Sequence, residues 1–211
     1  MAALDIHRRL LDAYGPQHWW PAESPFEMMV GAILTQNTNW KNVEKAMLNL
    51  KDADALDART ILDMDEDRLR GLIRPSGFFN QKAARLRLFC SFYLDNGGEA
   101  GMKGLDDPRH ALLALNGIGP ETADSMLLYA LGIPVFVIDA YTRRIFGRLG
   151  LTSPDASYHE LQVYFHARLE RNAPLFNDYH ALIVQHAKQH CRSRPVCSGC
   201  PLAAFCPSAT A

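Results

Sequence analysis

The residues best suited to metal chemistry are four cysteines near the C-terminal end of the 211-residue sequence. Five, two and five residues separate them in turn: Cys191, Cys197, Cys200 and Cys206. Four thiolates so close in sequence can converge on one centre, which is the ligand set of a [4Fe-4S] cluster or a structural zinc ion. Zinc modules usually contain two short cysteine pairs, whereas this set has one Cys-x-x-Cys flanked by longer steps, so the spacing favours iron.

Disulfide bonds are the alternative use of these cysteines. The first residues, MAALDIHRRLLDAY, have the pattern of an amphipathic helix with interspersed charges and not that of a secretory signal. The sequence therefore indicates an intracellular, reducing compartment, the cytoplasm or nucleoid of a bacterium or archaeon. Clustered cysteines in such a compartment more often bind metal than pair with each other. The fifth cysteine, Cys90, lies in an apolar helical pattern and is predicted to be a small buried residue.

The second chemically informative segment is LNGIGPETAD, residues 115–124. A helix ending at Leu115, a turn containing Gly117 and Gly119, and a helix starting at Pro120 predict a helix-hairpin-helix. Glycine permits a positive φ and lets backbone N–H groups approach an anion without an intervening Cβ. Together with the next helix N-terminus, these groups form a neutral cradle for one DNA phosphate. For this segment alone, the alternative is a plain helical hairpin whose glycines only cap a helix.

Asp139 is a carboxylate at the junction between an apolar run and a helical segment. It follows the apolar residues 135–138 and precedes the arginine-containing segment 140–148. This position predicts that Asp139 is the N-cap of a helix, a role that many aspartates have without any catalytic function.

Helices are expected to position all of these residues. Apolar side chains recur every three or four positions in seven segments: 26–34, 43–50, 83–93, 110–115, 123–131, 161–169 and 181–187. Alternation typical of strands is almost absent, so we predict an all-α protein of about ten helices. The sequence contains no repeat or low-complexity linker that would mark a domain boundary.

Composition excludes a membrane protein and leaves the partner open. Hydrophobic residues make up 48% of the chain, which is enough for a substantial core. The longest apolar run, near residues 125–137, is interrupted by Gly132 and Pro134 and is shorter than the ~20 residues that a membrane span requires. The net charge of −1 does not by itself indicate nucleic acid, although arginines cluster locally.

The combination of motifs carries a specific resemblance. LNGIGPETAD, followed by VFVIDAYTRR and the four-cysteine loop, resembles the helix-hairpin-helix DNA glycosylases of the endonuclease III superfamily over nearly the whole chain. The resemblance implies two helical lobes, one of residues 24–134 with the hairpin and the other of residues 1–23 and 135–211. It also implies a monomer that binds double-stranded DNA containing a damaged base and flips that base into the cleft. Asp139 is then catalytic, and the four cysteines hold a [4Fe-4S] cluster.

The resemblance extends to the segments that contact DNA. GAILTQN, residues 31–37, resembles the segment that ends in a duplex-inserting glutamine, here Gln36, and GFFNQKA, residues 77–83, resembles a strand-wedging loop that contains Phe78. The other predicted DNA contacts are Gly117, Gly119, Thr122, Arg143, Lys188, Arg192 and Arg194. Three histidines before the first cysteine of the loop are interpreted as a helix face near DNA or in solvent: His180, His186 and His190.

Two departures from the family pattern are informative. Bifunctional members have a lysine in the hairpin that attacks the sugar C1′, and this chain has Glu121 there. The resemblance thus implies a monofunctional glycosylase that uses water, with Asp139 activating the water or stabilising the positive charge on the sugar. The first cysteine interval is five residues where the family usually has six, which leaves the orientation of Arg192 and Arg194 toward phosphate open.

The aromatic residues near the N-terminus suggest which base is excised. Trp19, Trp20 and Pro21, together with Trp40, resemble the aromatic sandwich of the 3-methyladenine glycosylases in this superfamily. Such a base carries positive charge, which indole rings attract by about 1–2 kcal/mol when desolvated. The alternative for these tryptophans is packing in the core. The alternatives for function are a glycosylase for uracil, mispaired thymine or oxidised pyrimidines, and a non-catalytic helix-hairpin-helix DNA-binding module.

Overall fold

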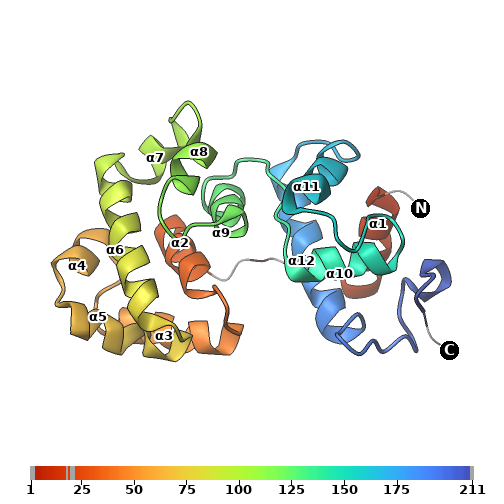
Figure 1. The fold of residues 1–211 in the computed structure, drawn as a ribbon, viewed down its shortest axis with the longest axis horizontal. Coiled ribbons are helices and arrows are strands. Elements are labelled where there is room, and N and C mark those ends of the chain that lie inside the picture. Colours follow the sequence, from red (N-terminus) through yellow and green to blue (C-terminus); the bar gives the residue numbers. More distant parts are fainter. Residues whose placement is uncertain (1–2, 18, 20–21, 210–211) are drawn as a thin grey trace. The chain divides into compact units, whose positions relative to one another are not determined.

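The structure is a computed structural model that describes residues 3–17, 19 and 22–209. Its α-helices are α1 (Ala3–Tyr14), α2 (Pro25–Leu34), α3 (Trp40–Asp52), α4 (Ala58–Asp63), α5 (Glu66–Ile73), α6 (Phe79–Asp95), α7 (Gly98–Lys103), α8 (Pro108–Leu113), α9 (Pro120–Ser125), α10 (Ala140–Arg148), α11 (Tyr158–His166) and α12 (Ala173–Gln189) (Figure 1). No strand occurs among the described residues, so the predicted all-α class is confirmed. None of the helices in this part of the chain is long and apolar enough to cross a membrane.

The chain divides into two compact units. Unit 1 consists of Met1–Trp20 and Ile133–Ala211, and unit 2 consists of the intervening residues 21–132. The sequence-based division placed the boundaries of the hairpin-bearing lobe at residues 24 and 134. Unit 1 contains Asp139 and the four cysteines, whereas unit 2 contains the hairpin.

Helix α2 forms the centre of unit 2. Its residues 26–34 are all buried, and α3, α6 and α9 pack against it. The helix starts where the sequence predicts, because Pro25 occupies the first turn and the Ser24 side chain accepts a hydrogen bond from the N–H of Glu27. The burial of α2 fixes the two segments at its ends, one of which continues into the predicted DNA-contacting residues 35–37.

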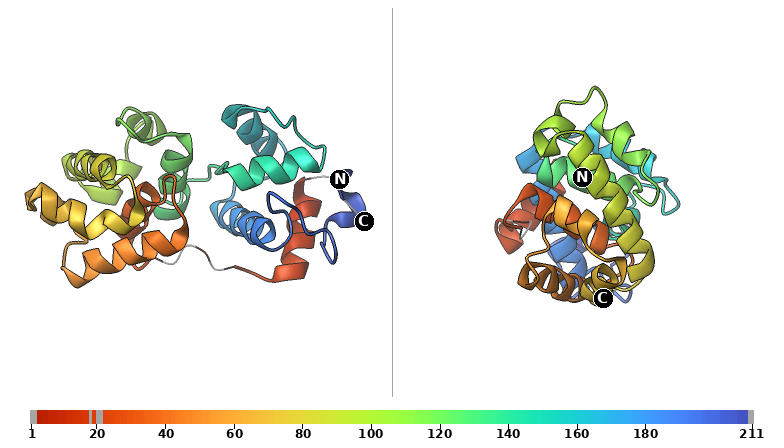
Figure 2. Two further views of the ribbon diagram at one scale, coloured as in Figure 1. Left: turned by 60° about the horizontal axis from the view of Figure 1, so that its bottom comes forward. Right: turned by 90° about the vertical axis from the view of Figure 1, so that its left-hand side faces the viewer.

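Helix α12 has the same role in unit 1. It packs against α1 and α10, and the views in Figures 1 and 2 agree in placing these helices side by side. Five aromatic side chains form the core beside it: Phe136, Phe146, Phe165, Phe176 and Tyr179. The rings of Phe136 and Phe165 stack with 3.8 Å between their centroids, which anchors the segment before Asp139 on α11.

Candidate functional site

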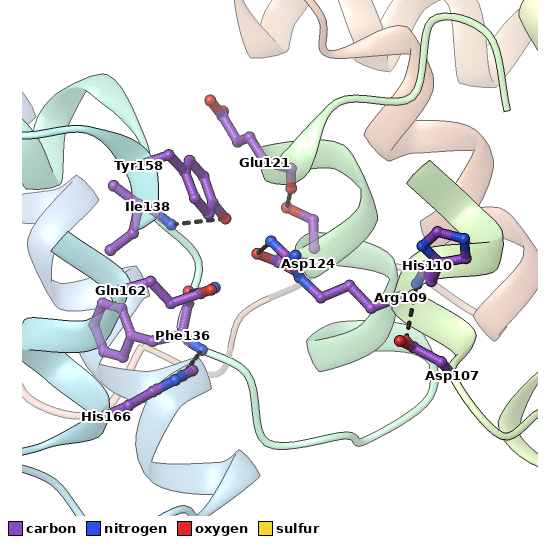
Figure 3. Close-up of polar contacts among 11 residues, drawn as sticks. Asp107, Arg109, His110, Glu121, Asp124, Phe136, Ile138, Tyr158, Gln162 and His166 are labelled. Carbon is purple, nitrogen blue, oxygen red and sulfur yellow. Dashed lines mark hydrogen bonds and ion pairs between the residues drawn. The ribbon is translucent and has the colours of Figure 1, made fainter. Parts of the chain in front are cut away.

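The helix-hairpin-helix predicted at residues 115–124 is present, as α8, a tight turn and α9. Asp107 caps α8 by accepting a hydrogen bond from the N–H of His110 (Figure 3). Gly117 has a φ of 87°, and a Cβ at this position would overlap the Arg85 side chain. Gly119 has a φ of −89° and open space around it. A positive φ is therefore required at Gly117 but not at Gly119.

An ion pair locks the two helices of the hairpin together. The Arg109 guanidinium donates to both carboxylate oxygens of Asp124 at 2.7 and 3.1 Å (Figure 3). The Asp124 side chain is completely buried. Since an unpaired buried carboxylate is strongly unfavourable, this two-point contact holds the hairpin in one conformation.

Gln36 braces the hairpin from outside. Its side-chain NH₂ group donates to the carbonyl oxygen of Gly117 at 3.0 Å and to the hydroxyl of Thr122 at 2.9 Å. Its amide oxygen accepts a hydrogen bond from Arg85 at 2.6 Å. Thr122 is buried and Gln36 is half-buried, so the structure places both predicted DNA contacts inside the fold of unit 2. Insertion of Gln36 into a duplex would require these bonds to break.

Lys82 connects the two segments that the resemblance places near DNA. Its ammonium group donates to the carbonyl oxygens of Leu34 and Ser76, at 2.8 Å in each case, and its side chain is 1% exposed. Burial, followed by the nearby charge of Arg85, lowers the pKa of Lys82 to about 8. Lys82 therefore holds unit 2 together and cannot reach a sugar without local unfolding.

Two exposed residues next to these braces have unusual backbone conformations. Asn37 has a φ of 53° and Phe78 a φ of 47°, in the left-handed region that few residues other than glycine adopt. The Phe78 side chain is 60% exposed, just before the first turn of α6. Backbone strain of this kind costs about 1–3 kcal/mol and is concentrated at functional sites. The positions of both residues support the predicted DNA-contacting role of these two segments.

Asp139 is positioned by the extended segment before it, residues 135–138, which is almost fully buried. Three polar side chains of α11 bind the backbone of this segment: Tyr158, Gln162 and His166. The N–H of Phe136 donates to the His166 ring and its carbonyl accepts from Gln162, while the N–H of Ile138 donates to the Tyr158 hydroxyl (Figure 3). Because buried backbone groups are thereby satisfied, the segment can end in a fixed carboxylate.

Asp139 is the N-cap of α10, as predicted. Its Oδ1 accepts hydrogen bonds from the backbone N–H of Thr142 at 2.6 Å and from the Thr142 hydroxyl at 2.8 Å. Its Oδ2 lies 3.5 Å from Nε2 of His180 on α12. Burial would raise the pKa of Asp139, but the contacts with His180 and Thr142 outweigh it and keep the pKa below its ordinary value. The result is a largely buried carboxylate that is ionised at neutral pH.

Trp19 lies in the same neighbourhood of unit 1. Its ring stacks on that of His180 with 6.2 Å between centroids, and the Lys188 ammonium lies 5.5 Å from the Trp19 ring centre. Trp40 begins α3 in unit 2 and donates from Nε1 to Glu44 at 2.7 Å. The other predicted base-binding residues, Trp20 and Pro21, lie outside the described residues. The structure thus places one of the predicted aromatic residues against His180, the histidine that faces Asp139.

The four cysteines line one cavity, together with apolar residues of α10 and the C-terminal loop such as Ile145 and Leu202. Burial, followed by the charges of the other three cysteines, raises the pKa of the Cys200 thiol in this cavity. Among the described residues, no three histidine, cysteine or acidic side chains are gathered as they are around a single metal ion. The shared cavity and the four sulfur donors fit a group that takes four thiolate ligands.

Two arginines of α10 hold the cysteine loop. Arg144 donates to the carbonyl oxygen of Cys191 at 2.8 Å. Arg148 donates to the carbonyl oxygens of Arg192 and Ser193, at 2.6 and 2.8 Å, and its guanidinium lies 3.3 Å from the Cys191 sulfur. Residues in an arginine cluster that looked suited to phosphate thus bind the loop instead.

The remaining predicted contacts are distributed over the surface of unit 1. Arg143 is half-buried on α10, Lys188 and Arg194 are exposed, and Arg192 donates to the Lys188 carbonyl oxygen at 2.8 Å. Their role toward DNA stays a prediction.

The histidines of α12 differ from the sequence-based interpretation. His180 is 6% exposed and His186 is 2% exposed, so these two do not form a solvated face. His186 lies between the Tyr14 hydroxyl, 2.8 Å from its Nδ1, and the Cys200 sulfur, 3.9 Å from its Nε2. The sequence-based interpretation places the three histidines on a helix face near DNA or in solvent, but α12 is the central helix of its unit and other elements pack against it.

Comparison with known proteins gives the family. Residues 30–171 match the model described as HhH-GPD superfamily base excision DNA repair protein. The chain is 49% identical over 206 residues to a candidate DNA repair glycosylase of Methanocaldococcus jannaschii, covering 95% of this chain and 94% of the relative. It is 30% identical over 185 residues to Endonuclease III of Sulfolobus acidocaldarius, covering 86% of this chain and 81% of that protein.

Solved structures agree with this result. The 3-methyladenine DNA glycosylase of H. pylori bound to 1,N6-ethenoadenine matches with a TM-score of 0.78 and 33% identity, over 90% of this chain and 98% of that one. A trapped Endonuclease III–DNA covalent intermediate has the same fold, with a TM-score of 0.85 and 21% identity over 99% of this chain and 97% of that one. The chain belongs to the HhH-GPD superfamily of base excision DNA repair proteins.

Proposed function

We propose that this protein is a monofunctional DNA glycosylase that acts as a monomer on double-stranded DNA and hydrolyses the bond between a damaged base and its sugar. The observation that carries the proposal is the buried, ionised carboxylate of Asp139 at the start of α10, in a chain that has Glu121 where bifunctional members have lysine. The hairpin in unit 2 supplies the phosphate cradle that the family requires.

The residues of the site have distinct roles in this reaction. Cleavage of the glycosidic bond leaves positive charge on the sugar, and the Asp139 carboxylate stabilises this charge. The oxygen of a water molecule bonds to C1′ as the base departs, and Asp139 accepts the proton that the water releases. The hairpin N–H groups and the loops that contain Asn37 and Phe78 bind the DNA backbone and the distorted duplex. Within the segment 35–37, Asn37 is the exposed residue, so we infer that it enters the duplex while Gln36 braces the hairpin.

The two lysines considered as alternatives to water, Lys82 and Lys188, both have other contacts in the described structure. Lys82 is buried and donates to two carbonyl oxygens of unit 2. Lys188 is exposed on α12, where its ammonium group lies against the Trp19 ring. A carboxylate at position 121 cannot form a Schiff base. These observations support a glycosylase without strand-cleaving lyase activity.

An alkylated purine such as 3-methyladenine is the substrate that the site favours. Such a base is a flat cation with a weak glycosidic bond, so it needs little protonation before it leaves. Trp19 lies beside the partner of the catalytic carboxylate, and its electron-rich ring already attracts the Lys188 ammonium. The 33% identity to a 3-methyladenine glycosylase over 90% of this chain adds support. The runner-up is excision of a pyrimidine lesion, which the 30% identity to Endonuclease III favours.

A panel of lesion duplexes tests the proposal. Purified protein is incubated with duplexes that contain 3-methyladenine, 1,N6-ethenoadenine, uracil, mispaired thymine or an oxidised pyrimidine, and base release is measured with and without alkaline strand cleavage. We expect release of alkylated purine, with strands that break only after alkali. Activity on uracil alone, or strand breaks without alkali, would transfer the assignment to the runner-up, and binding without release of any base would indicate a DNA-binding module.

The tryptophans supply a sharper prediction on the same duplexes. Loss of a stacked aromatic residue typically costs about 1–3 kcal/mol of base binding, so Trp40→Ala should lower excision of alkylated purine by about 5–150-fold. Binding of an undamaged duplex should change little, because that binding depends on phosphate contacts. Trp40 also donates to Glu44, and Glu44→Ala removes this bond while leaving the ring. Equal losses of excision and of undamaged-duplex binding in Trp40→Ala would contradict a role in stacking.

We also propose that the four cysteines hold a [4Fe-4S] cluster, which supplies rigidity to the loop beside α10 when bound. The purified protein should be brown, with about four iron and four sulfide ions per chain. Cys200→Ser should lower the iron content, whereas the matched change Cys90→Ser, at a buried cysteine in unit 2, should leave it unchanged. Colourless protein with stoichiometric zinc after anaerobic purification would refute the cluster.

A further inference from the structure

We propose that His180 is the positioning residue of the reaction: it holds Oδ2 of Asp139 in the ionised, reactive form while the N-cap interaction holds Oδ1. This inference rests on the proposed role of Asp139 and adds to it a second residue from a different helix. The sequence resemblance assigns no such role to a histidine, and the pattern around His180 suggested an exposed face.

The geometry divides the two oxygens of the carboxylate between two helices. Oδ1 receives both hydrogen bonds of Thr142, at 2.6 and 2.8 Å, and is thereby committed to the start of α10. Oδ2 faces Nε2 of His180 at 3.5 Å, from α12. This separation is longer than an ordinary N–H···O hydrogen bond. Catalytic hydrogen bonds are often long in the free enzyme and shorten in the complex with substrate. Because Oδ1 is committed to the helix cap, Oδ2 is the oxygen that remains available for reaction.

The surroundings make this contact important. The side chains of His180 and Asp139 are 8% and 12% exposed, and the Trp19 ring stacks on the histidine. A carboxylate in such a place takes up a proton readily, because burial disfavours the charged form. In a site with so little water, an N–H group that points at the carboxylate is worth more than it is at the surface.

Among the described residues, the groups that act on the pKa of Asp139 belong to α10 and α12. Thr142 on α10 contributes its N–H and hydroxyl, and His180 contributes from α12. The charged neighbours on α10, Arg144 and Arg148, donate to backbone carbonyls of the cysteine loop. The hydroxyl of Tyr158 on α11 accepts from the N–H of Ile138. Removal of the His180 imidazole should therefore have a measurable effect on the carboxylate.

The direction of the pH effect follows from this balance. The pKa of Asp139 lies below its ordinary value because His180 and Thr142 together outweigh burial. The carboxylate is active when ionised, so activity is present above this pKa and is lost as the pH falls through it. Without the His180 donor, burial dominates and the pKa rises, which moves the acid limb of the pH profile to higher pH.

The experiment compares His180→Phe with His180→Gln. Phenylalanine keeps a ring for Trp19 to stack on but has no N–H group, whereas the Gln side-chain amide can place an N–H near the position of Nε2. We expect the acid limb of the pH profile of single-turnover excision to move to higher pH by about one unit or more in His180→Phe. His180→Gln should restore most of the parent profile. If His180→Phe does not fold, His180→Met is the second variant without a donor, and its flexible side chain adapts to the same space.

A second histidine–aspartate pair in unit 1 provides the matched control. His7 Nε2 lies 3.0 Å from Asp178 Oδ2 and is also buried, but it contacts α12 away from Asp139. His7→Phe removes a comparable pair, so it reports the effect of losing such a pair on the stability of unit 1. It should leave the acid limb where it is. A shift of equal size in both variants would overturn the proposal, as would a parent-like profile in the folded donor-free His180 variant.

A readout independent of excision separates this inference from the proposed function. The carboxyl carbon of Asp139 is followed by ¹³C NMR during a pH titration of aspartate-labelled protein and is assigned by its loss in Asp139→Asn. The pKa should rise in the donor-free variant and return in His180→Gln, whether or not any base is excised. A protein that excises no base but shows this shift would refute the glycosylase while retaining the pair. An unchanged pKa in an active enzyme would refute the pair alone.

Discussion

Asp139→Asn should reduce base excision by about 10²–10⁴-fold while the protein stays folded. The physical reason is charge, because a carboxylate stabilises the positive sugar and accepts a proton from water, and an amide of the same size does neither. The substitution is informative because asparagine caps a helix about as well as aspartate. The oxygen that receives the Thr142 hydrogen bonds can therefore be kept. Single-turnover excision from a duplex with the preferred lesion measures the effect.

Binding should respond in the opposite direction to catalysis. The Asp139 carboxylate in the proposed complex faces the phosphate backbone, so removing its charge should leave DNA affinity unchanged or increase it. Fluorescence anisotropy with a lesion duplex measures this affinity. Asp178→Asn is the matched control, since Asp178 is another aspartate of unit 1 paired with a histidine. An Asp139→Asn protein that releases base at close to the parent rate would refute the catalytic assignment.

The features that could be predicted from sequence depend on local rules. Asp139 is an N-cap because a short side chain with an oxygen acceptor, placed directly before a helical segment, can accept a hydrogen bond from an N–H of the first turn. The hairpin follows from Gly117 and Pro120, which mark a turn and a helix start within four residues. Cys90 is fully buried, as its apolar helical context predicted. In each of these cases, the neighbouring residues in the chain determine the local structure.

The features that sequence reasoning missed depend on contacts between distant segments. His180 is 41 positions from Asp139 (180 − 139), and only the packing of α10 on α12 brings the two together. Gln36 is predicted by resemblance to insert into the duplex, and the sequence does not show that Arg85 and the hairpin bind all of its polar atoms in the free protein. One signal was available for His180: it directly precedes the apolar stretch ALIV in the middle of a long helix, where buried positions are concentrated.

The arginines of α10 are another case in which sequence reasoning did not predict a contact between distant segments. An Arg-Arg pair after a catalytic aspartate suggests phosphate binding, but a guanidinium also binds backbone carbonyls wherever a loop has no regular structure of its own. Arg144 and Arg148 reach loop residues more than 40 positions away. The first cysteine interval is one residue shorter than is usual in the family. This is compatible with the arginine contacts, because Arg144 and Arg148 bind backbone carbonyls of the loop. Sequence spacing alone could not reveal whether these arginines bind phosphate or backbone carbonyls.

Glu121→Lys should convert the enzyme into one that forms a covalent adduct with DNA. The lysine nitrogen would bond to C1′ as the bond between C1′ and the base breaks, and would then lose a proton. The C1′–O4′ bond breaks next, O4′ takes up a proton, and the resulting imine is reduced by borohydride to a stable amine. Glu121 is exposed in the first turn of α9, so a longer side chain can be accommodated. The positive end of the helix disfavours an ammonium group and so lowers its pKa, which makes the free amine more available. The stability cost should be about 0.3–1 kcal/mol.

Borohydride trapping on a duplex with the preferred lesion measures this change, with the parent protein giving no adduct. Glu121→Gln is the matched control, because it removes the same negative charge without supplying an amine and should trap nothing. Adding Asp139→Asn to the lysine variant should reduce the adduct strongly, since the carboxylate is still needed to release the base. A folded Glu121→Lys protein that excises base at the parent rate and traps no DNA would show that position 121 does not approach C1′. The absence of lyase activity in the parent would then need another explanation than the missing amine.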